Sequence, residues 1–193
     1  MKKTIVGVTV VGSDRGGIVA AFTNFAFTSG GNVEKVNQNV IKGLFGMYLE
    51  ISFAKKINVK KFDSQIQALA RREKMDVSTY HETNTQKNIA VFVTKEGHCL
   101  DAIMKNSRTL RGRIALIVGT ERTLAPKKAG IPFVLVSGRN QQRAEEKIIR
   151  ACKKYDIDLI ALARYMRILS PNFVWRYPNR IINIHPSILP AFP

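Results

Sequence analysis

The hydrophobic pattern of this chain changes its rhythm near residue 85, and that change constrains the fold more than any other feature. Before it, two segments with helical spacing separate four segments with the character of strands. After it, short continuous apolar runs alternate with segments of helical spacing. The polar, aperiodic stretch between the halves, residues 82–87, is the best linker candidate. We therefore predict two domains, at residues 1–84 and 87–193.

The first domain has the order strand, helix, strand, strand, helix, strand. Its strands are predicted over Thr4–Val11, Asn32–Ile41, Leu44–Phe53 and Met75–His81. Its helices are marked by apolar residues at helical spacing, first Ile18, Phe22 and Phe25, and then Phe62, Ile66 and Leu69. Lys42-Gly43 suits a hairpin turn, and Gly30-Gly31 ends the first helix. The order βαββαβ is that of the ferredoxin-like fold, in which two βαβ units share one antiparallel sheet.

The second domain alternates strands with helices throughout. Strands are predicted over Asn88–Thr94, Ile114–Val118, Pro132–Val136, Leu159–Ala163 and Arg180–Ile184. The segments between them are predicted as helices over Leu100–Met104, residues 144–155 and Pro171–Tyr177, with a short helix or turn over Thr123–Ala129. Short apolar strands between amphipathic helices indicate a parallel, doubly wound α/β sheet of the Rossmann-like kind.

The charge balance favours an anionic partner. The chain has 31 Lys and Arg residues against 14 Asp and Glu residues, a net charge of +17. Such an excess attracts nucleic acid, an acidic membrane surface or a polyanionic small molecule. The basic residues are scattered and do not interleave with aromatic residues, so we expect no nucleic-acid partner. No apolar run approaches the ~20 residues that span a bilayer, so we also expect no membrane partner.

The cysteines and the N-terminus exclude other classes of protein. Cys99 and Cys152 are too few for a disulfide scaffold and too far apart for a zinc signature. His98 and Cys99 are adjacent without other ligands nearby, so no metal site is expected. The apolar stretch after Lys3 is short and meets no small-residue cleavage site, which argues against a signal peptide. We expect a cytoplasmic protein.

Asn183 and His185 are the strongest candidates for chemistry. They are two residues apart on the last predicted strand, so both side chains point to the same face. In open parallel sheets, ligands bind beyond the carboxyl ends of the strands. An amide and an imidazole there can bind a developing oxyanion and move a proton. The alternative is a strand-end pair that satisfies nearby backbone groups.

The segment 163–171 lies at another strand's carboxyl end. It precedes a helix whose start is marked by Ser170 as N-cap and Pro171. Its apolar residues would stand in an exposed loop, which indicates a pocket wall for a flat ring. The alternative is a loop that packs under the helix.

Together these segments resemble a known family. Ala-Arg-Tyr-Met-Arg-Ile-Leu-Ser-Pro at 163–171 and the run Arg-Tyr-Pro-Asn-Arg-Ile-Ile-Asn-Ile-His-Pro-Ser-Ile-Leu-Pro-Ala-Phe at 176–192 are similar to the formyltetrahydrofolate-dependent formyltransferase fold. Within it, the chain resembles the formyltetrahydrofolate deformylases, which carry an ACT domain before the catalytic domain. Residues 12–20 are similar to the opening of ACT domains, and residues 92–100 look like the first strand and turn of the deformylase domain.

The resemblance implies hydrolysis of 10-formyltetrahydrofolate to tetrahydrofolate and formate, with the formate supplied to purine biosynthesis. It implies no cofactor, because the folate is the substrate. Asn183 would hold the formyl oxygen, and His185 would act as oxyanion partner and proton shuttle. The pterin ring would be bordered by Met166, Arg167, Ile168 and Leu169.

The resemblance also gives the ACT domain a role. Asp14, Gly16 and Gly17 would form a strand-to-helix turn, and such turns often bind an amino-acid effector at a dimer interface. A homo-oligomer is therefore expected. The alternative is a turn with a purely structural role.

The chain departs from the family at Gly16, where many ACT domains have proline, and at two places that bear on the activity. Relatives that formylate glycinamide ribonucleotide hold its phosphate in a Gly-rich turn, whereas here Lys95 and Glu96 precede a single glycine, Gly97. Water is therefore favoured as the formyl acceptor. Family members also continue past the segment that ends at Pro193, to an Asp that works beside the His, so we expect a truncated C-terminus and impaired activity. The alternative function is that of a non-catalytic, amino-acid-binding regulatory protein of the ACT type.

Overall fold

The computed structural model describes residues 4–81, 86–94, 97–110, 112–122, 130–136 and 140–183. By its contacts the chain forms two units. The first comprises residues 1–84 and 170–178, and the second comprises residues 85–169 and 179–193. Within the described ranges, none of the helices is both long and apolar enough to cross a membrane.

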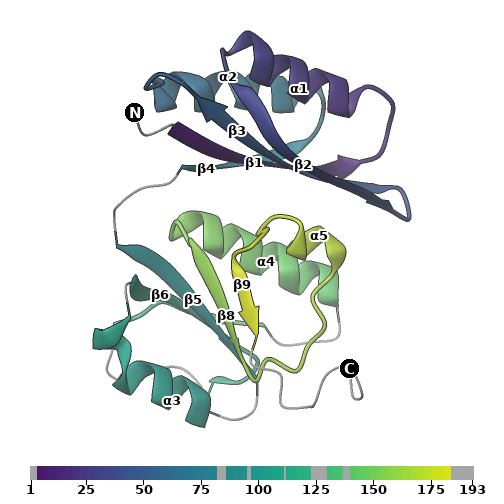
Figure 1. Ribbon diagram of the computed structural model, residues 1–193. Coiled ribbons are helices and arrows are strands. Elements are labelled where there is room, and N and C mark those ends of the chain that lie inside the picture. The colour runs from purple at the N-terminus through teal and green to yellow at the C-terminus, as the bar shows by residue number, and fades with distance from the viewer. Residues whose placement is uncertain are drawn as a thin grey trace, which may run out of the picture. The chain divides into compact units, whose positions relative to one another are not determined.

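The first unit contains a four-stranded antiparallel sheet with the strand order β2-β3-β1-β4. The strands are β1 (Thr4–Ser13), β2 (Asn32–Ile41), β3 (Leu44–Phe53) and β4 (Asp76–His81). Helices α1 (Ile18–Thr28) and α2 (Val59–Arg72) cover one face of this sheet (Figure 1). The predicted ferredoxin-like order is confirmed.

The core of the first unit lies between the sheet and its two helices. Val6, Val8 and Val10 of β1 are fully buried in it, together with Ile18 and Phe22 of α1. Burying each such side chain stabilises the fold by ~1.5–3 kcal/mol. The alternation along β1 and the helical spacing on α1 therefore determine which faces meet.

The turns of the first unit follow the predicted chemistry. Lys42 and Gly43 have φ values of 50° and 76°, as a two-residue type I′ hairpin requires. Gly30 ends α1 with a φ of 77°, and the N–H of Gly31 donates to the carbonyl of Ala26 at 3.0 Å. A Cβ on Gly31 would collide with the side chain of Ile51, so glycine is required there for space.

The second unit contains a five-stranded parallel sheet with the order β7-β6-β5-β8-β9. Its strands are β5 (Lys87–Val93), β6 (Gly112–Gly119), β7 (Phe133–Leu135), β8 (Leu159–Ala163) and β9 (Ile181–Asn183). Helix α3 (His98–Lys105) lies on one face and α4 (Gln141–Lys154) on the other (Figure 1). The predicted doubly wound parallel sheet is confirmed.

The described residues also include two short helices. A 3-10 turn, η1 (Ser107–Thr109), follows α3 and was not predicted. Helix α5 (Pro171–Val174) begins after Ser170, whose hydroxyl accepts a hydrogen bond from the N–H of Phe173, as predicted for an N-cap. The element predicted over Thr123–Ala129 lies outside the described residues.

Strand β5 shows why the sequence of the second domain contains continuous apolar runs. Ala90, Val91, Phe92 and Val93 are consecutive, and all four are fully buried. A central parallel strand has helices over both faces, so neither set of alternating side chains reaches water.

Candidate active site

The carboxyl ends of the parallel strands bring the predicted site residues to one edge of the sheet. Val93 at the end of β5 pairs with Ala163 at the end of β8, and Leu162 of β8 pairs with Asn183 of β9. The segments that follow β5 and β8, and the last residue of β9, therefore meet at this edge. It is the edge where open parallel sheets bind their ligands.

Asn183 is the last residue of β9 and is exposed. Its position at a strand end suits a carboxamide that donates to a ligand oxygen. His185 lies outside the described residues, so its pairing with Asn183 stays a prediction.

The loop after β8, residues 164–169, is anchored by a buried aromatic ring. Tyr165 is 9% exposed and packs edge-on against Phe92 of β5, with ring centroids 5.4 Å apart. Burial raises the pKa of Tyr165 above its ordinary value. The ring fixes the start of the loop to the centre of the sheet.

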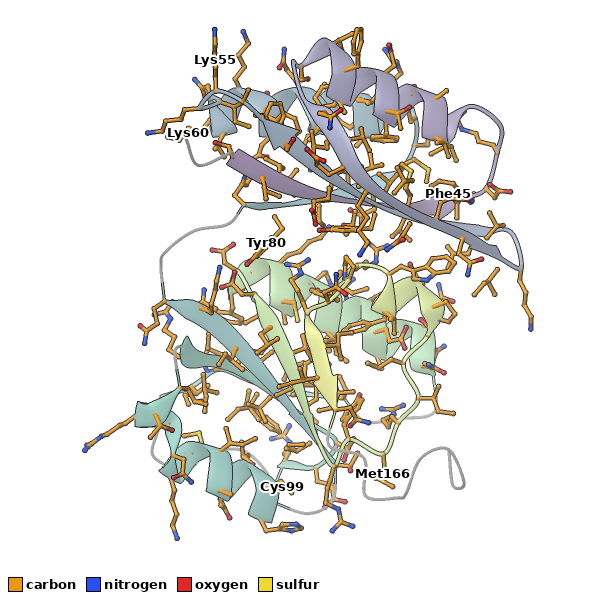
Figure 2. The ribbon with its side chains drawn as sticks, in the orientation of Figure 1. Phe45, Lys55, Lys60, Tyr80, Cys99 and Met166 are labelled. Atoms are coloured by element: carbon orange, nitrogen blue, oxygen red, sulfur yellow. The ribbon has the colours of Figure 1, made fainter. Side chains whose placement is uncertain are left out.

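Beyond this anchor the loop presents apolar side chains to solvent. Met166 is 68% exposed and Ile168 is 87% exposed. Met166 projects at the end of the unit where β8 finishes (Figure 2). Two exposed apolar side chains two residues apart in one loop can contribute to the wall of a site for an apolar ring.

The main chain and one charged side chain of the loop are tied to neighbouring segments. The Arg167 guanidinium donates through Nη1 to the carbonyl of Val136, just after β7, at 3.1 Å. Gln141 Nε2, at the start of α4, donates to the carbonyl of Ile168 at 2.7 Å. Leu169 is half-buried. Of the four residues predicted to border the pterin, Met166 and Ile168 therefore present side chains to solvent, and Arg167 bonds within the protein.

Thr94 and Gln141 are contacts of the site that the sequence analysis missed. Thr94 Oγ1 donates to the carbonyl of Arg164 and accepts from the N–H of Met166 at 3.3 Å. The sequence feature that could have predicted the role of Thr94 is its position as the first polar residue at the end of a buried strand. Gln141 carried a weaker signal, as the residue after the N-cap Asn140.

The turn before α3 lacks the features of a phosphate site in the part that the structure describes. Gly97 is the N-cap of α3 with a φ of −85°, so it uses no left-handed conformation. Asp101 stands in the first turn of α3. Its negative charge in this turn disfavours a phosphate at the positive end of the helix. Lys95 and Glu96 lie outside the described residues.

The predicted effector turn of the ACT domain joins β1 to α1. Asp14 is exposed, and its N–H donates to the carbonyl of Gly43 at 2.8 Å. Gly17 is the N-cap of α1 with a φ of 86°, which favours glycine. Gly16 would have open space around a Cβ. The turn therefore has a structural role at Gly17, and effector binding stays a prediction.

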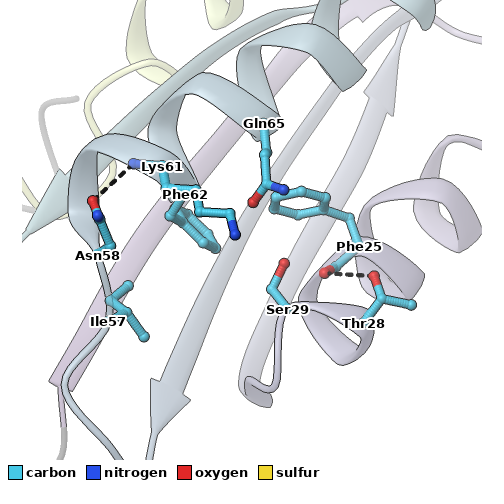
Figure 3. A pocket seen from close by; sticks show the side chains of 8 residues that line it. All are labelled: Phe25, Thr28, Ser29, Ile57, Asn58, Lys61, Phe62 and Gln65. Carbon is cyan, nitrogen blue, oxygen red and sulfur yellow. Dashed lines mark hydrogen bonds between the residues drawn. The ribbon is translucent and has the colours of Figure 1, made fainter.

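A cavity of about 650 Å³ opens between α1 and α2 of the same unit (Figure 3). It is lined by Phe25, Thr28, Ser29, Ile57, Asn58, Lys61, Phe62 and Gln65. The residues of the predicted effector turn are not among these. Sequence reasoning could not find the cavity, because its walls come from two helices about 30 residues apart. The described residues also contain no group of three or more side chains that could hold a metal ion.

Comparisons with known proteins assign both halves of the chain. Residues 87–193 match a family model described as formyl transferase, and residues 4–80 match one described as ACT domain. The chain is 37% identical over 189 residues to a formyltetrahydrofolate deformylase of Bacillus subtilis (strain 168), covering 93% of this chain and 63% of that protein. The chain thus spans somewhat less than two thirds of that relative.

Solved structures agree with this assignment. A formyltetrahydrofolate deformylase from Pseudomonas syringae pv. tomato matches 100% of this chain and 67% of its own, with 25% identity and a TM-score of 0.51. A glycinamide ribonucleotide transformylase from Geobacillus kaustophilus matches 56% of this chain and 63% of its own, with 34% identity and a TM-score of 0.51. The chain therefore belongs to the formyl transferase family, with an ACT domain preceding its formyl transferase domain.

Proposed function

We propose that this protein hydrolyses 10-formyltetrahydrofolate to tetrahydrofolate and formate. The observation that carries the proposal is the sharing of one sheet edge by the exposed Asn183 and the exposed apolar loop of Met166 and Ile168. A carboxamide there suits the formyl group, and an apolar wall suits the pterin ring. The formate would serve purine biosynthesis.

In the proposed reaction, water adds to the formyl carbon and the carbon–nitrogen bond breaks. Asn183 donates to the formyl oxygen as negative charge develops on it, and His185 carries the proton that the departing folate nitrogen takes up. The net charge of +17 favours approach of the acidic glutamate tail of a folate.

Two observations favour water over an amine-bearing nucleotide as the formyl acceptor. The Asp101 carboxylate stands in the first turn of α3, where a nucleotide phosphate would otherwise bind. The match to the Bacillus subtilis deformylase covers 93% of this chain, whereas the match to the Geobacillus kaustophilus transformylase covers 56%. The longer match includes the ACT domain, which the chain therefore shares with the deformylase.

The test is formate release from 10-formyltetrahydrofolate by the purified protein, with and without glycinamide ribonucleotide. We expect formate in both cases and a fall of ~10²–10³-fold in rate for Asn183→Ala, as for the loss of one oxyanion donor. Asn106→Ala is the matched control, because Asn106 is an exposed asparagine at the end of α3. Formyl transfer to the nucleotide in place of hydrolysis would overturn the proposal, as would an Asn183→Ala rate equal to that of the control.

A second function, binding of an amino acid by the ACT domain, is favoured by the cavity between α1 and α2. Lys61 supplies a cation for a carboxylate, and Phe25 and Phe62 supply an apolar wall (Figure 3). Calorimetry with single amino acids tests it. Lys61→Ala should weaken binding about tenfold, as for loss of one charge-assisted contact. Lys60→Ala should not, because Lys60 points away from the unit (Figure 2). Equal effects of the two variants would place the ligand elsewhere.

A further inference from the structure

We infer that Gln141 and Glu145 of α4 are positioning residues that hold the loop at 164–169 in the shape that receives the folate. The inference rests on the proposed function. Neither residue belongs to the loop, and neither was among the predicted site residues.

The carboxamide of Gln141 joins the helix to the loop. Its Nε2 donates to the main-chain carbonyl of Ile168 at 2.7 Å and to Oε1 of Glu145 at 3.0 Å. Glu145 is one helical turn further along α4, so the two side chains lie on the same face. The carboxylate thereby fixes the direction of the amide group, which points its other N–H at the loop.

Glu145 stands where α4 otherwise buries apolar side chains. It is 5% exposed and falls at helical spacing with the buried Ile148, Ile149 and Cys152. A buried carboxylate destabilises a fold unless hydrogen bonds compensate for its lost hydration. An apolar residue would suit this stripe better for stability alone, so the carboxylate points to a specific task.

The charge of Glu145 acts on the anchor of the loop. Burial has the largest effect on the pKa of Tyr165 and raises it, the charge of Arg167 lowers it, and the charge of Glu145 raises it. Both charges therefore act on the ring that anchors the loop.

Side chains of three described residues are among the tethers that hold the loop. Thr94 holds the N–H of Met166, Arg167 holds the carbonyl of Val136, and Gln141 holds the carbonyl of Ile168. The Gln141 tether is the one nearest to the most exposed apolar side chain, Ile168. A loop held in its binding shape loses less conformational entropy when the ligand arrives, which strengthens binding.

The test compares Gln141→Leu with Gln142→Leu. Gln142 makes the same bond one residue along the helix, with Nε2 donating to Glu146 Oε1 at 3.1 Å, and both partners are exposed. We expect Gln141→Leu to raise the KM for 10-formyltetrahydrofolate about tenfold with kcat within about twofold, the effect of one lost hydrogen bond on binding. Gln142→Leu should leave both constants unchanged.

Amide hydrogen exchange gives a readout that needs no turnover. Gln141→Leu should speed exchange at residues 166–169 about tenfold, and Gln142→Leu should not. Glu145→Leu should behave like Gln141→Leu, whereas Glu145→Gln keeps an oxygen acceptor and should restore slow exchange. Unchanged exchange in Gln141→Leu would overturn the inference, and so would equal loosening in Gln142→Leu. Loosened exchange in a protein that releases no formate would instead count against the proposed function.

Discussion

The hydroxyl of Thr94 accepts a hydrogen bond from the main-chain N–H of Met166 at 3.3 Å. The same oxygen donates to the carbonyl of Arg164, so one side chain after β5 holds two peptide groups of the loop after β8. The contact exists because β5 and β8 are neighbours in the parallel sheet and end together. Thr94 is 8% exposed, so water cannot readily replace these bonds.

Thr94→Val tests the hydrogen bonds that Thr94 makes to the loop, because the substitution leaves the shape of the side chain unchanged. Valine keeps the shape of threonine but leaves two loop backbone groups without their partner, at a cost of ~1–3 kcal/mol. We expect a lower denaturation midpoint for the second unit and a higher KM for the folate. Thr9→Val in β1 is the control, because Thr9 is also buried but bonds to Ser78 in the first unit. Its KM should match that of the parent, and an equal rise in both variants would contradict the role of Thr94.

The two asparagine N-caps offer a matched comparison of helix stability and site function. Asn140 accepts from the N–H of Arg143 at 2.9 Å, and Asn58 accepts from the N–H of Lys61 at 3.1 Å. Replacing either by alanine should cost ~1 kcal/mol, measured by chemical denaturation. Only Asn140→Ala should raise the KM for the folate, because it loosens the helical turn that carries Gln141. A KM change of equal size in Asn58→Ala would show that the effect is global.

Lys74 ends α2 in a conformation that favours glycine. Its φ is 52°, and the next N–H, that of Met75, donates to the carbonyl of Ala70 at 2.9 Å. We expect Lys74→Gly to stabilise the first unit by ~1 kcal/mol, because the left-handed conformation costs about that much for a residue with a Cβ. Thermal denaturation measures the shift. Gly30→Ala, at the corresponding position after α1, should shift the midpoint the other way, and shifts of the same sign would refute this explanation.

Glu73 makes the stability of the first unit depend on pH. The Arg15 guanidinium beside it, with help from Arg72, holds the pKa of the Glu73 carboxyl below its ordinary value. A lowered folded pKa stabilises the protein above the ordinary glutamate pKa of ~4.3 and loses that contribution as the pH falls through the folded value. Glu73→Gln should therefore be less stable than the parent at pH 7, and the difference should vanish in acid.

Denaturation curves recorded from pH 7 down to about pH 3 would follow this difference. Arg15→Gln should remove most of the same dependence, because Arg15 has the largest effect on Glu73. High salt should weaken this pH dependence of the stability, because Arg15 is half-exposed. Parallel profiles of stability against pH for the parent and Glu73→Gln would show that Glu73 does not cause the pH dependence.

The local elements of both units could be predicted from the sequence, because hydrophobic spacing and turn chemistry act over a few residues. Lys42-Gly43 predicted the hairpin, Gly30 predicted the end of α1, and Ser170 predicted the start of α5. The continuous apolar run of β5 indicated a strand covered on both faces. The sequence could also have predicted the buried contact of Glu145, because a charged residue within the apolar stripe of a helix indicates a buried polar contact.

The tertiary structure alone decided which of these segments meet. The strand order β7-β6-β5-β8-β9 places Thr94 beside Met166 and Gln141 beside Ile168, although no sequence period relates them. The cavity between α1 and α2 likewise depends on how two helices pack on one sheet. Periodicity determines which face of each element is buried, because burial is a local property of the side chains. The partners across that face depend on the long-range pairing of strands, and that pairing sets the shape of the loop proposed to receive the folate.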